Sequence, residues 1–168
     1  MPLEQDIAAL ILQESTLTLP GFTPDTAWQL GTTIRDLALT RGLSLVVDVR
    51  RFGSPHQQLF YTALEGTTPD NVEWVRRKNN VVARFHRSSY AVGLKLRAKN
   101  ETLATQQGLP LADYAVNGGA FPLAVPGAGV IGSATVSGLP ERDDHELVVE
   151  ALCDLLRRDY AELRLAAQ

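Results

Sequence analysis

Residues 125–138 read VPGAGVIGSATVSG, and this stretch decides which fold the chain can adopt. Its glycines Gly127, Gly129 and Gly132 match the G-x-G-x-x-G spacing of a dinucleotide-binding turn. Such a turn follows a strand and opens a helix whose N-terminus receives the pyrophosphate of the cofactor. An acidic residue about 20 positions further on then binds the ribose. The fold therefore depends on whether a helix or a strand follows Gly132.

The residues after the last of these glycines favour a strand. Residues 133–137 are Ser-Ala-Thr-Val-Ser, and a Gly-Leu-Pro turn at 138–140 closes them. The next acids, Asp143-Asp144, come too early to bind a ribose and begin the following helix. We therefore predict a β-hairpin with strands over 121–125 and 129–137, in which the glycines shape the turn and allow close packing of strands.

A second hairpin is predicted in the first half of the chain. β-Rich runs cover 43–49 and 58–64, and a Gly-Ser-Pro turn at 53–55 joins them. Strands that come as hairpins pair antiparallel, whereas a parallel sheet needs a crossover helix between its strands. The predicted fold class is α+β, with helices covering an antiparallel sheet. The 168 residues are of single-domain length, so we expect one domain over 1–168.

The helices are predicted from capping signals and apolar spacing. Thr-Pro-Asp occurs at 23–25 and at 68–70, where Thr can cap free N–H groups and Pro fits the first helical position. The segment 17–22 between the first two helices is expected to be extended. The expected helices cover 3–14, 23 to about 42, 68 to about 88, short segments near 102–106 and 111–115, and 143 to about 165.

Composition and charge argue against several classes of partner. The 16 Lys and Arg against 19 Asp and Glu give a net charge of −3 without a basic block, so we expect no nucleic-acid partner. No apolar run approaches the roughly 18 residues that a membrane span needs, and acids stand where a signal peptide would be basic. The single cysteine, Cys153, excludes an internal disulfide. We therefore expect a cytoplasmic protein that does not bind membranes.

Two separate motifs resemble the GlcG/HbpS-like family of haem-binding and haem-degrading domains. One is GGAFPLAVPGAGVIGSATVSGLPERDDHELV at 118–148, with its Gly-Gly-x-x-Pro turn and acidic helix start. The other is VDVR at 47–50 followed by GTTPDNVEWVRRKNNVVARFHRSS at 66–89, which is similar to a largely uncharacterised branch of the family. The resemblance covers about residues 23–160.

The resemblance implies a profilin-like three-layer α/β/α fold with a five-stranded antiparallel sheet, and homo-oligomers built on dimers. It also implies a haem-associated function, because some relatives bind haem and degrade it, although others have no assigned activity. The alternative is a non-catalytic oligomeric module, since no complete set of catalytic residues appears. A third hypothesis is that the pocket that would otherwise hold haem binds a small anionic metabolite.

The helix that starts near residue 68 aims a cation, Lys78, at the protein interior. At 100° per residue, Lys78 falls in the middle of an apolar stripe formed by Asn71, Trp74, Val75, Val81, Val82 and Phe85. Burying an unpaired ammonium costs several kcal/mol, so Lys78 needs a partner. One interpretation is an ion pair with Asp48 or Asp113, or a buried stem whose tip reaches solvent. The other is a pocket in which Lys78 binds a carboxylate, such as a haem propionate.

Among the three histidines, His86 is the best-placed candidate for an iron ligand. No histidine has a second His or Cys at metal-ligand spacing, so a protein-only zinc site is not expected. A haem iron needs only one axial ligand, and His86 lies beside Phe85 and the Ser88-Ser89 pair. The alternative is an ordinary surface histidine.

The start of the last helix completes the candidate site. Acids there stabilise the positive end of the helix by default. In the alternative, this helix start and the turns at 118–119 and 138–140 wall a shared pocket whose N–H groups face an anion. The candidate ligand-binding residues are Lys78, His86, Ser89, Gly118, Gly119, Arg142 and Asp143.

Overall fold

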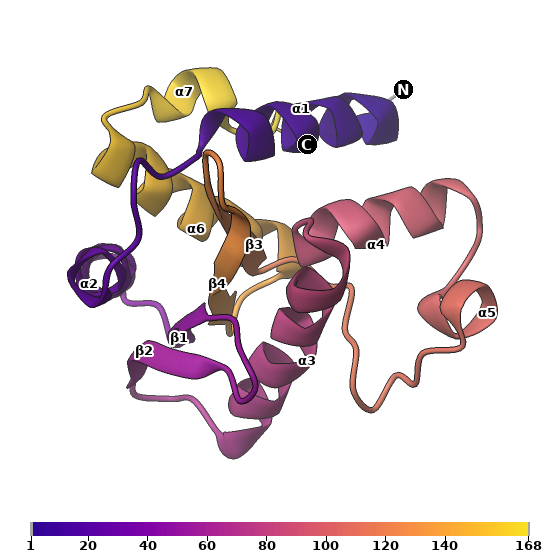
Figure 1. The fold of residues 1–168 in the computed structure, drawn as a ribbon, viewed down its shortest axis with the longest axis horizontal. Coiled ribbons are helices and arrows are strands. Elements are labelled where there is room, and N and C mark those ends of the chain that lie inside the picture. The colour runs from indigo at the N-terminus through magenta and orange to yellow at the C-terminus, as the bar shows by residue number, and fades with distance from the viewer. Residues whose placement is uncertain (1, 168) are drawn as a thin grey trace.

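A four-stranded antiparallel sheet lies at the centre of the computed structural model, which describes residues 2–167 (Figure 1). The strands are β1 (Val46–Arg51), β2 (Gln57–Ala63), β3 (Ala120–Val125) and β4 (Gly129–Ser137), in the order β2-β1-β4-β3. Helices flank this sheet, which confirms the predicted α+β class.

The expectation of a fifth strand is wrong for the described residues. The extended segment 17–22 reaches the outer edge of β3, where the Leu19 N–H donates to the Ala124 carbonyl at 2.8 Å. No other backbone hydrogen bond joins residues 17–22 to β3. A single hydrogen bond does not make a ladder, so the sheet stops at four strands.

The stretch that decides the fold forms a β-hairpin, as predicted. Gly127 and Gly129 have φ angles of 84° and 80°, which few residues other than glycine adopt, and they make the turn between β3 and β4. At Gly132, a Cβ would lie 2.1 Å from the Arg50 carbonyl oxygen of β1. Glycine therefore permits the close approach of β4 to β1. A strand follows Gly132, so these residues do not form a dinucleotide-binding turn.

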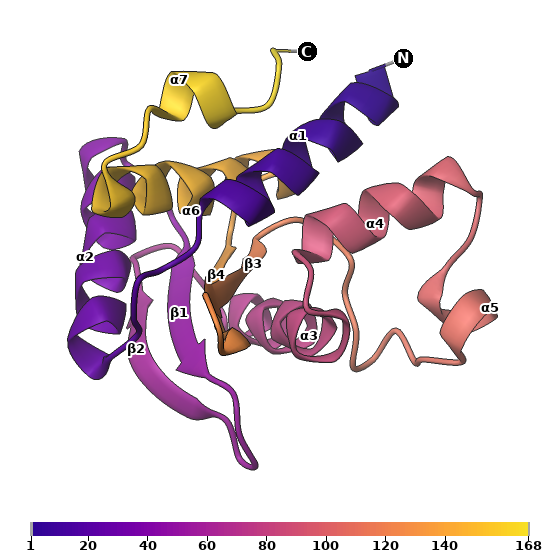
Figure 2. The same ribbon diagram turned by 45° about the horizontal axis from the view of Figure 1, so that its top comes forward.

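The helices form layers on the two faces of the sheet (Figure 2). α2 (Pro24–Thr40) and α6 (Glu141–Leu156) pack on one face, and α3 (Pro69–Phe85) packs on the other. The first face carries the main apolar core, which includes Leu30, Ile34, Val47, Val49, Phe121, Val136 and Leu152. The second face is more polar at its centre, because Asn79 of α3 binds Asp48 of β1 there.

The remaining helices extend this arrangement at two places (Figures 1 and 2). α1 (Pro2–Thr16) lies beside α7 (Tyr160–Leu163), close to α6. α4 (Ser89–Ala98) and α5 (Leu103–Gln107) follow α3 and project away from the sheet. No helix among residues 2–167 has the length and apolar character needed to cross a membrane.

The helix starts predicted from the two Thr-Pro-Asp signals are confirmed, but two predicted helix ends are wrong. Thr23 caps α2 in a capping box, as its Thr-Pro-Asp signal predicted. α3 ends at Phe85 instead of near 88, because His86 adopts a left-handed conformation with φ 55°. α6 ends at Leu156 instead of near 165 for the same reason at Arg157, which has φ 54°. Short-range patterns did not show these breaks, since both residues are unusual in that conformation.

The region between α3 and β3 differs most from the prediction. α4 was not predicted, although Ser88 caps it by accepting the Ala91 N–H at 3.1 Å. The short helix near 102–106 is confirmed as α5. The helix predicted over 111–115 is a turn, because the Ala115 N–H bonds the Arg77 carbonyl of α3 at 3.2 Å and not its own helix.

Candidate functional site

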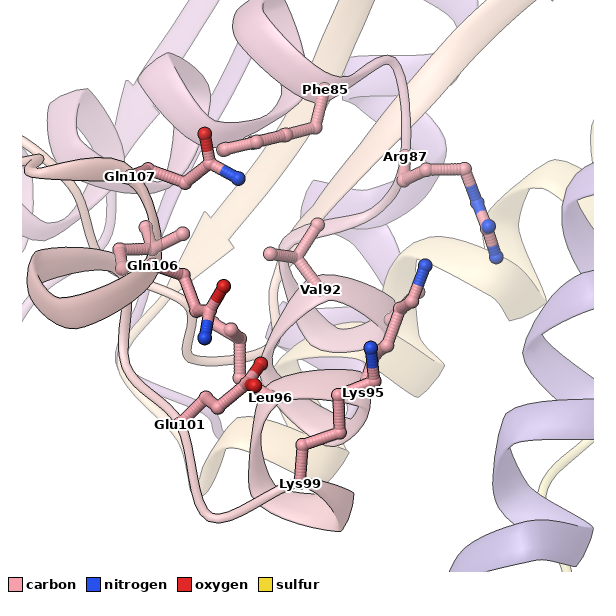
Figure 3. Close-up of a pocket in the computed structure, with 11 residues that line it drawn as sticks. Phe85, Arg87, Val92, Lys95, Leu96, Lys99, Glu101, Gln106 and Gln107 are labelled. Carbon is pink, nitrogen blue, oxygen red and sulfur yellow. The ribbon is translucent and has the colours of Figure 1, made fainter.

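α4 forms one wall of a groove with an apolar floor and a basic rim (Figure 3). Val92, Lys95, Leu96 and Lys99 recur at i, i+3, i+4 and i+7, so they share one face of the helix. Phe85, at the end of α3, and residues of α5 close the groove, which has a volume of about 310 Å³. We call it the basic-rimmed groove. Its lining residues are Phe85, Arg87, Ala91, Val92, Lys95, Leu96, Lys99, Glu101, Leu103, Gln106 and Gln107.

The rim of this groove is positively charged. Arg87, Lys95 and Lys99 supply cations, against one carboxylate from Glu101. Arg87 is paired with Glu14 of α1. Within residues 2–167, Lys95 and Lys99 have no ion-pair partner. Figure 3 shows the basic side chains on the opposite side of the groove from Gln106 and Gln107. The rim can therefore attract carboxylates or phosphates.

Lys78 lies in a second pocket, between α3 and the start of α6. Its side chain is 3% exposed, and Nζ donates to Asp144 at 2.9 Å and to the Val136 carbonyl at 3.1 Å. The pocket has a volume of about 240 Å³, and we call it the Lys78 pocket. Its lining residues are Asn71, Trp74, Lys78, Asn117, Ser137, Gly138, Leu139, Glu141 and Asp144.

Neither predicted carboxylate partner of Lys78 is correct. Asp48 is bound instead by Arg50, whose Nε donates at 2.7 Å, and by side-chain amides. Asp113 pairs with Arg76 at the surface. The true partner, Asp144, is one of the acids at the start of α6, for which we predicted a role in stabilising the helix end or in walling a pocket, but no pairing with Lys78. Nothing in the local sequence distinguishes it from its neighbours, because the pairing depends on how α3 docks against α6.

Burial and charge act in opposite directions on the Lys78–Asp144 pair. Burial lowers the pKa of Lys78, and attraction to Asp144 opposes that change. Burial raises the pKa of Asp144, although Lys78 and the Leu139 N–H, at 2.9 Å, stabilise its charged form. Both pKa shifts favour the uncharged forms. The proton between Nζ and Asp144 is therefore held less firmly by Lys78 than in an exposed ion pair.

Gly118 and Gly119 lie directly behind this pair. The Gly118 N–H donates to the Glu141 carboxylate at 3.3 Å, so it is already engaged within the chain. At Gly119, where φ is 134°, a Cβ would come within 2.8 Å of Lys78 Nζ. Gly119 thus leaves the space that the buried amine occupies.

The other four candidate residues lie outside the Lys78 pocket. His86 is exposed at the end of α3, next to the basic-rimmed groove but not among its lining residues. Ser89 is buried and binds the backbone of β3, which tethers α4 to the sheet. Arg142 pairs with Asp6 of α1 at 2.6 Å, and Asp143 is exposed. The seven candidate residues therefore do not meet in one site.

His145 is a core histidine and not an exposed ligand. It is fully buried in α6, where Nε2 hydrogen-bonds Gln13 of α1 at 2.8 Å. Tyr90 and Phe121 pack on its ring, with centroids 5.3 and 5.8 Å away. Burial lowers its pKa to about 3, so the ring is neutral at physiological pH.

The basic-rimmed groove was not predicted from the sequence, although a signal for it was present. Val92, Lys95, Leu96 and Lys99 show the helical spacing of an amphipathic face that combines apolar and basic residues. Without a predicted helix at 89–98, that spacing was not apparent.

Known proteins match most of this chain in sequence or in structure. A UPF0303 protein of Paraburkholderia phymatum is 58% identical over 166 residues, which cover 99% of each chain. The crystal structure of the Ybr137w protein matches with a TM-score of 0.82 and 26% identity, over 92% of this chain and 94% of that one. The crystal structure of a PduOC:Heme complex matches with a TM-score of 0.67 at 14% identity, over 79% and 94%, and therefore supports the fold alone. A family model described as "Haem degrading protein HbpS-like" matches residues 22–153, and the chain belongs to this HbpS-like family.

Proposed function

We propose that the chain binds haem in the basic-rimmed groove. The observation that carries this proposal is the apolar floor of Phe85, Val92 and Leu96 beneath two lysines without ion-pair partners. Such a site suits a planar apolar molecule with two carboxylates. The family description and the haem complex of a protein with the same fold support it. We place this binding in the cytoplasm, because the only cysteine, Cys153, is a buried free thiol.

The residues of the groove fit the porphyrin and its propionates. Lys95 and Lys99 are four residues apart, a rise of about 6 Å along α4, so both can reach carboxylates at one end of a ligand. Lys78 does not serve this role in our proposal, because Asp144 already matches its charge. The groove volume of about 310 Å³ is at the lower end for ligand sites, so haem would extend beyond the groove.

The iron would need a ligand from the edge of the groove. Its lining residues include no His, Cys, Met or Tyr. His86 follows Phe85 directly and is therefore our proposed iron ligand. Bound haem would supply redox and oxygen chemistry, as the family description implies, and the protein would hold the carboxylates and shield one face from water.

Titrations with hemin and with metal-free protoporphyrin IX test this proposal. We expect saturable binding of both, followed by the Soret band for hemin and by fluorescence for protoporphyrin. Reversing both charges in Lys95→Glu/Lys99→Glu should weaken both by at least about tenfold, because each lysine contributes a charge-assisted contact. Arg84→Glu, an exposed change on α3 outside the groove, is the matched control. His86→Ala should alter only the hemin spectrum. Absence of saturation, or wild-type affinity in the double variant, would contradict the proposal.

We also propose that the protein forms homo-oligomers built on dimers. β2 is an edge strand, and residues 57–64 carry no charge to prevent pairing with a second chain. Tyr61 of this strand is 43% exposed, and Trp28 of α2, whose ring contacts Phe60 of the strand, is 63% exposed. Light scattering at several concentrations should show at least a dimer, and Tyr61→Lys should shift it toward the monomer. A monomer at every concentration would refute this proposal and leave haem binding untouched.

A further inference from the structure

The chain has three lysines, and only Lys78 is buried. Lys95 is exposed on α4, and Lys99 is exposed at its C-cap. The side chain of Lys78 is 3% exposed, and this residue lines the Lys78 pocket. Removing a lysine ammonium from water costs free energy, and the presence of an ion pair is weak evidence that its burial stabilises the fold. The pocket beside it suggests a chemical use for the amine.

Hydrogen bonds hold the Lys78 ammonium in place, but they do not use all of its N–H donors. An ammonium has three N–H donors, and Nζ uses two of them on Asp144 and the Val136 carbonyl, at 2.9 and 3.1 Å. Among residues 2–167, the third has no protein acceptor. The missing side chain of Gly119 keeps the space next to Nζ open. The backbone N–H groups of Gly138 and Leu139 fix the Asp144 carboxylate, at 3.4 and 2.9 Å.

The walls of the pocket suit a small uncharged polar molecule. Asn71, Asn117 and Ser137 offer hydrogen-bonding side chains, and Trp74 offers an aromatic face. Glu141 also faces the pocket, although Arg97 binds its carboxylate with two hydrogen bonds of 2.6 and 2.7 Å. With Asp144 and Glu141 beside a single ammonium, the pocket has no net positive charge to attract an anion.

We propose that Lys78 forms an imine with a small, hydroxylated aldehyde or ketone bound in this pocket, and that Asp144 transfers the protons. Burial favours the neutral, nucleophilic form of a lysine, and a carboxylate beside it can take up and return the proton. The directions of the two pKa shifts are consistent with this use, since burial favours the neutral amine and the protonated acid. The site is separate from the haem proposal, which uses the groove on α4.

The reaction balances with these two residues and the carbonyl compound alone. Asp144 takes a proton from the Lys78 ammonium, and the freed nitrogen lone pair adds to the carbonyl carbon. The carbonyl π electrons move to oxygen, which receives the proton from Asp144. Asp144 then removes a proton from nitrogen and delivers it to the hydroxyl, which leaves as water. One carbonyl and one ammonium become one protonated imine and one water, and the Asp144 carboxylate is restored.

Reductive trapping tests the proposal within one sample. Folded wild-type protein is incubated at pH 7 with glycolaldehyde and sodium cyanoborohydride, whose hydride converts an imine into a stable secondary amine. Peptide mapping by mass spectrometry then gives the rate of modification at each of the three lysines. The same reaction in urea gives the rate of each lysine in the unfolded chain. This comparison does not depend on whether any variant folds.

We expect folding to accelerate Lys78 by at least about tenfold, while Lys95 and Lys99 change little, because general acid–base assistance acts only in the pocket. In Asp144→Asn, folded as judged by circular dichroism, the acceleration should be lost. Lys78→Arg should remove the fast site and leave the other two rates unchanged. If folding instead protects Lys78, so that it reacts no faster than in urea, the proposal is overturned and the pair is purely structural.

Discussion

Replacing Gly132 with alanine tests the strand packing on which the fold depends. The new Cβ would lie 2.1 Å from the Arg50 carbonyl oxygen and 3.4 Å from Arg51 Cα, both in the backbone of β1. Carbon and carbonyl oxygen normally approach no closer than about 3.3 Å, so β1 and β4 would have to separate by about 1 Å. Overpacking costs about 1–3 kcal/mol, and a backbone obstacle places this site near 3. Since 1 kcal/mol lowers Tm by about 2–4 °C at this chain length, we expect a loss of roughly 6–12 °C.

Thermal unfolding followed by circular dichroism measures this loss. The matched control is Gly21→Ala, because a Cβ at Gly21 would meet no atom within 4 Å and the residue has no left-handed φ. We expect the control to melt within about 2 °C of the wild type, since it adds little beyond a smaller unfolded-state entropy. If Gly132→Ala melted with the control, β1 could not lie against β4 as described. The two variants would melt together if Gly132 were needed only to make room for a cofactor phosphate, because alanine there would then impair binding and not stability.

Two further substitutions test the buried polar groups. Asp144→Asn leaves the Lys78 ammonium buried without its carboxylate, so urea unfolding should show that the free energy of unfolding falls by about 3–5 kcal/mol. The double variant Lys78→Met/Asp144→Leu should recover most of that stability. Equal stability of Asp144→Asn and the wild type would contradict this reasoning. His145 is neutral when folded, with a pKa of about 3, but takes up a proton below its ordinary value of 6.5 when unfolded. Stability should therefore fall by about 2 kcal/mol between pH 7 and pH 5, and His145→Phe should abolish that part of the pH dependence. An unchanged slope in His145→Phe would show that the ring is not buried in its neutral form.

The parts of the fold that were predicted correctly are those that neighbouring residues determine. The hairpin at residues 120–137 follows from turn glycines between β-prone runs, and the start of α2 follows from Thr23 and the two residues after it. The errors arose where distant segments decide the outcome. The segment 17–22 was correctly expected to be extended, but only its packing against β3 shows that it makes one hydrogen bond there. The end of α3 at His86 is a further example, because the chain must turn there to place α4.

The candidate site shows the same division between local and distant effects. That Lys78 is buried could be predicted from its position on the apolar stripe of its own helix. Its partner could not, because Asp144 lies 66 residues away and reaches Nζ only when α6 docks beside α3. A buried cation on an amphipathic helix therefore predicts that a partner exists, but the identity of that partner is a property of the tertiary structure.

The Lys78 pocket is built on a helix, α3, that is fixed to the sheet, whereas the basic-rimmed groove is built mainly on α4 and α5. Asn79 donates to Asp48 of β1 at 3.2 Å and accepts from Thr135 of β4 at 2.8 Å, so α3 cannot slide along the sheet without breaking buried hydrogen bonds. Lys78 is the preceding residue and shares this rigid anchor, which suits a reaction that needs a fixed distance to Asp144. The basic-rimmed groove lies beyond the break at His86, where α4 and α5 pack around a small separate core that includes Leu103 and does not belong to the main one. Our two proposals, haem binding in the groove and covalent chemistry at Lys78, therefore rest on different parts of the structure.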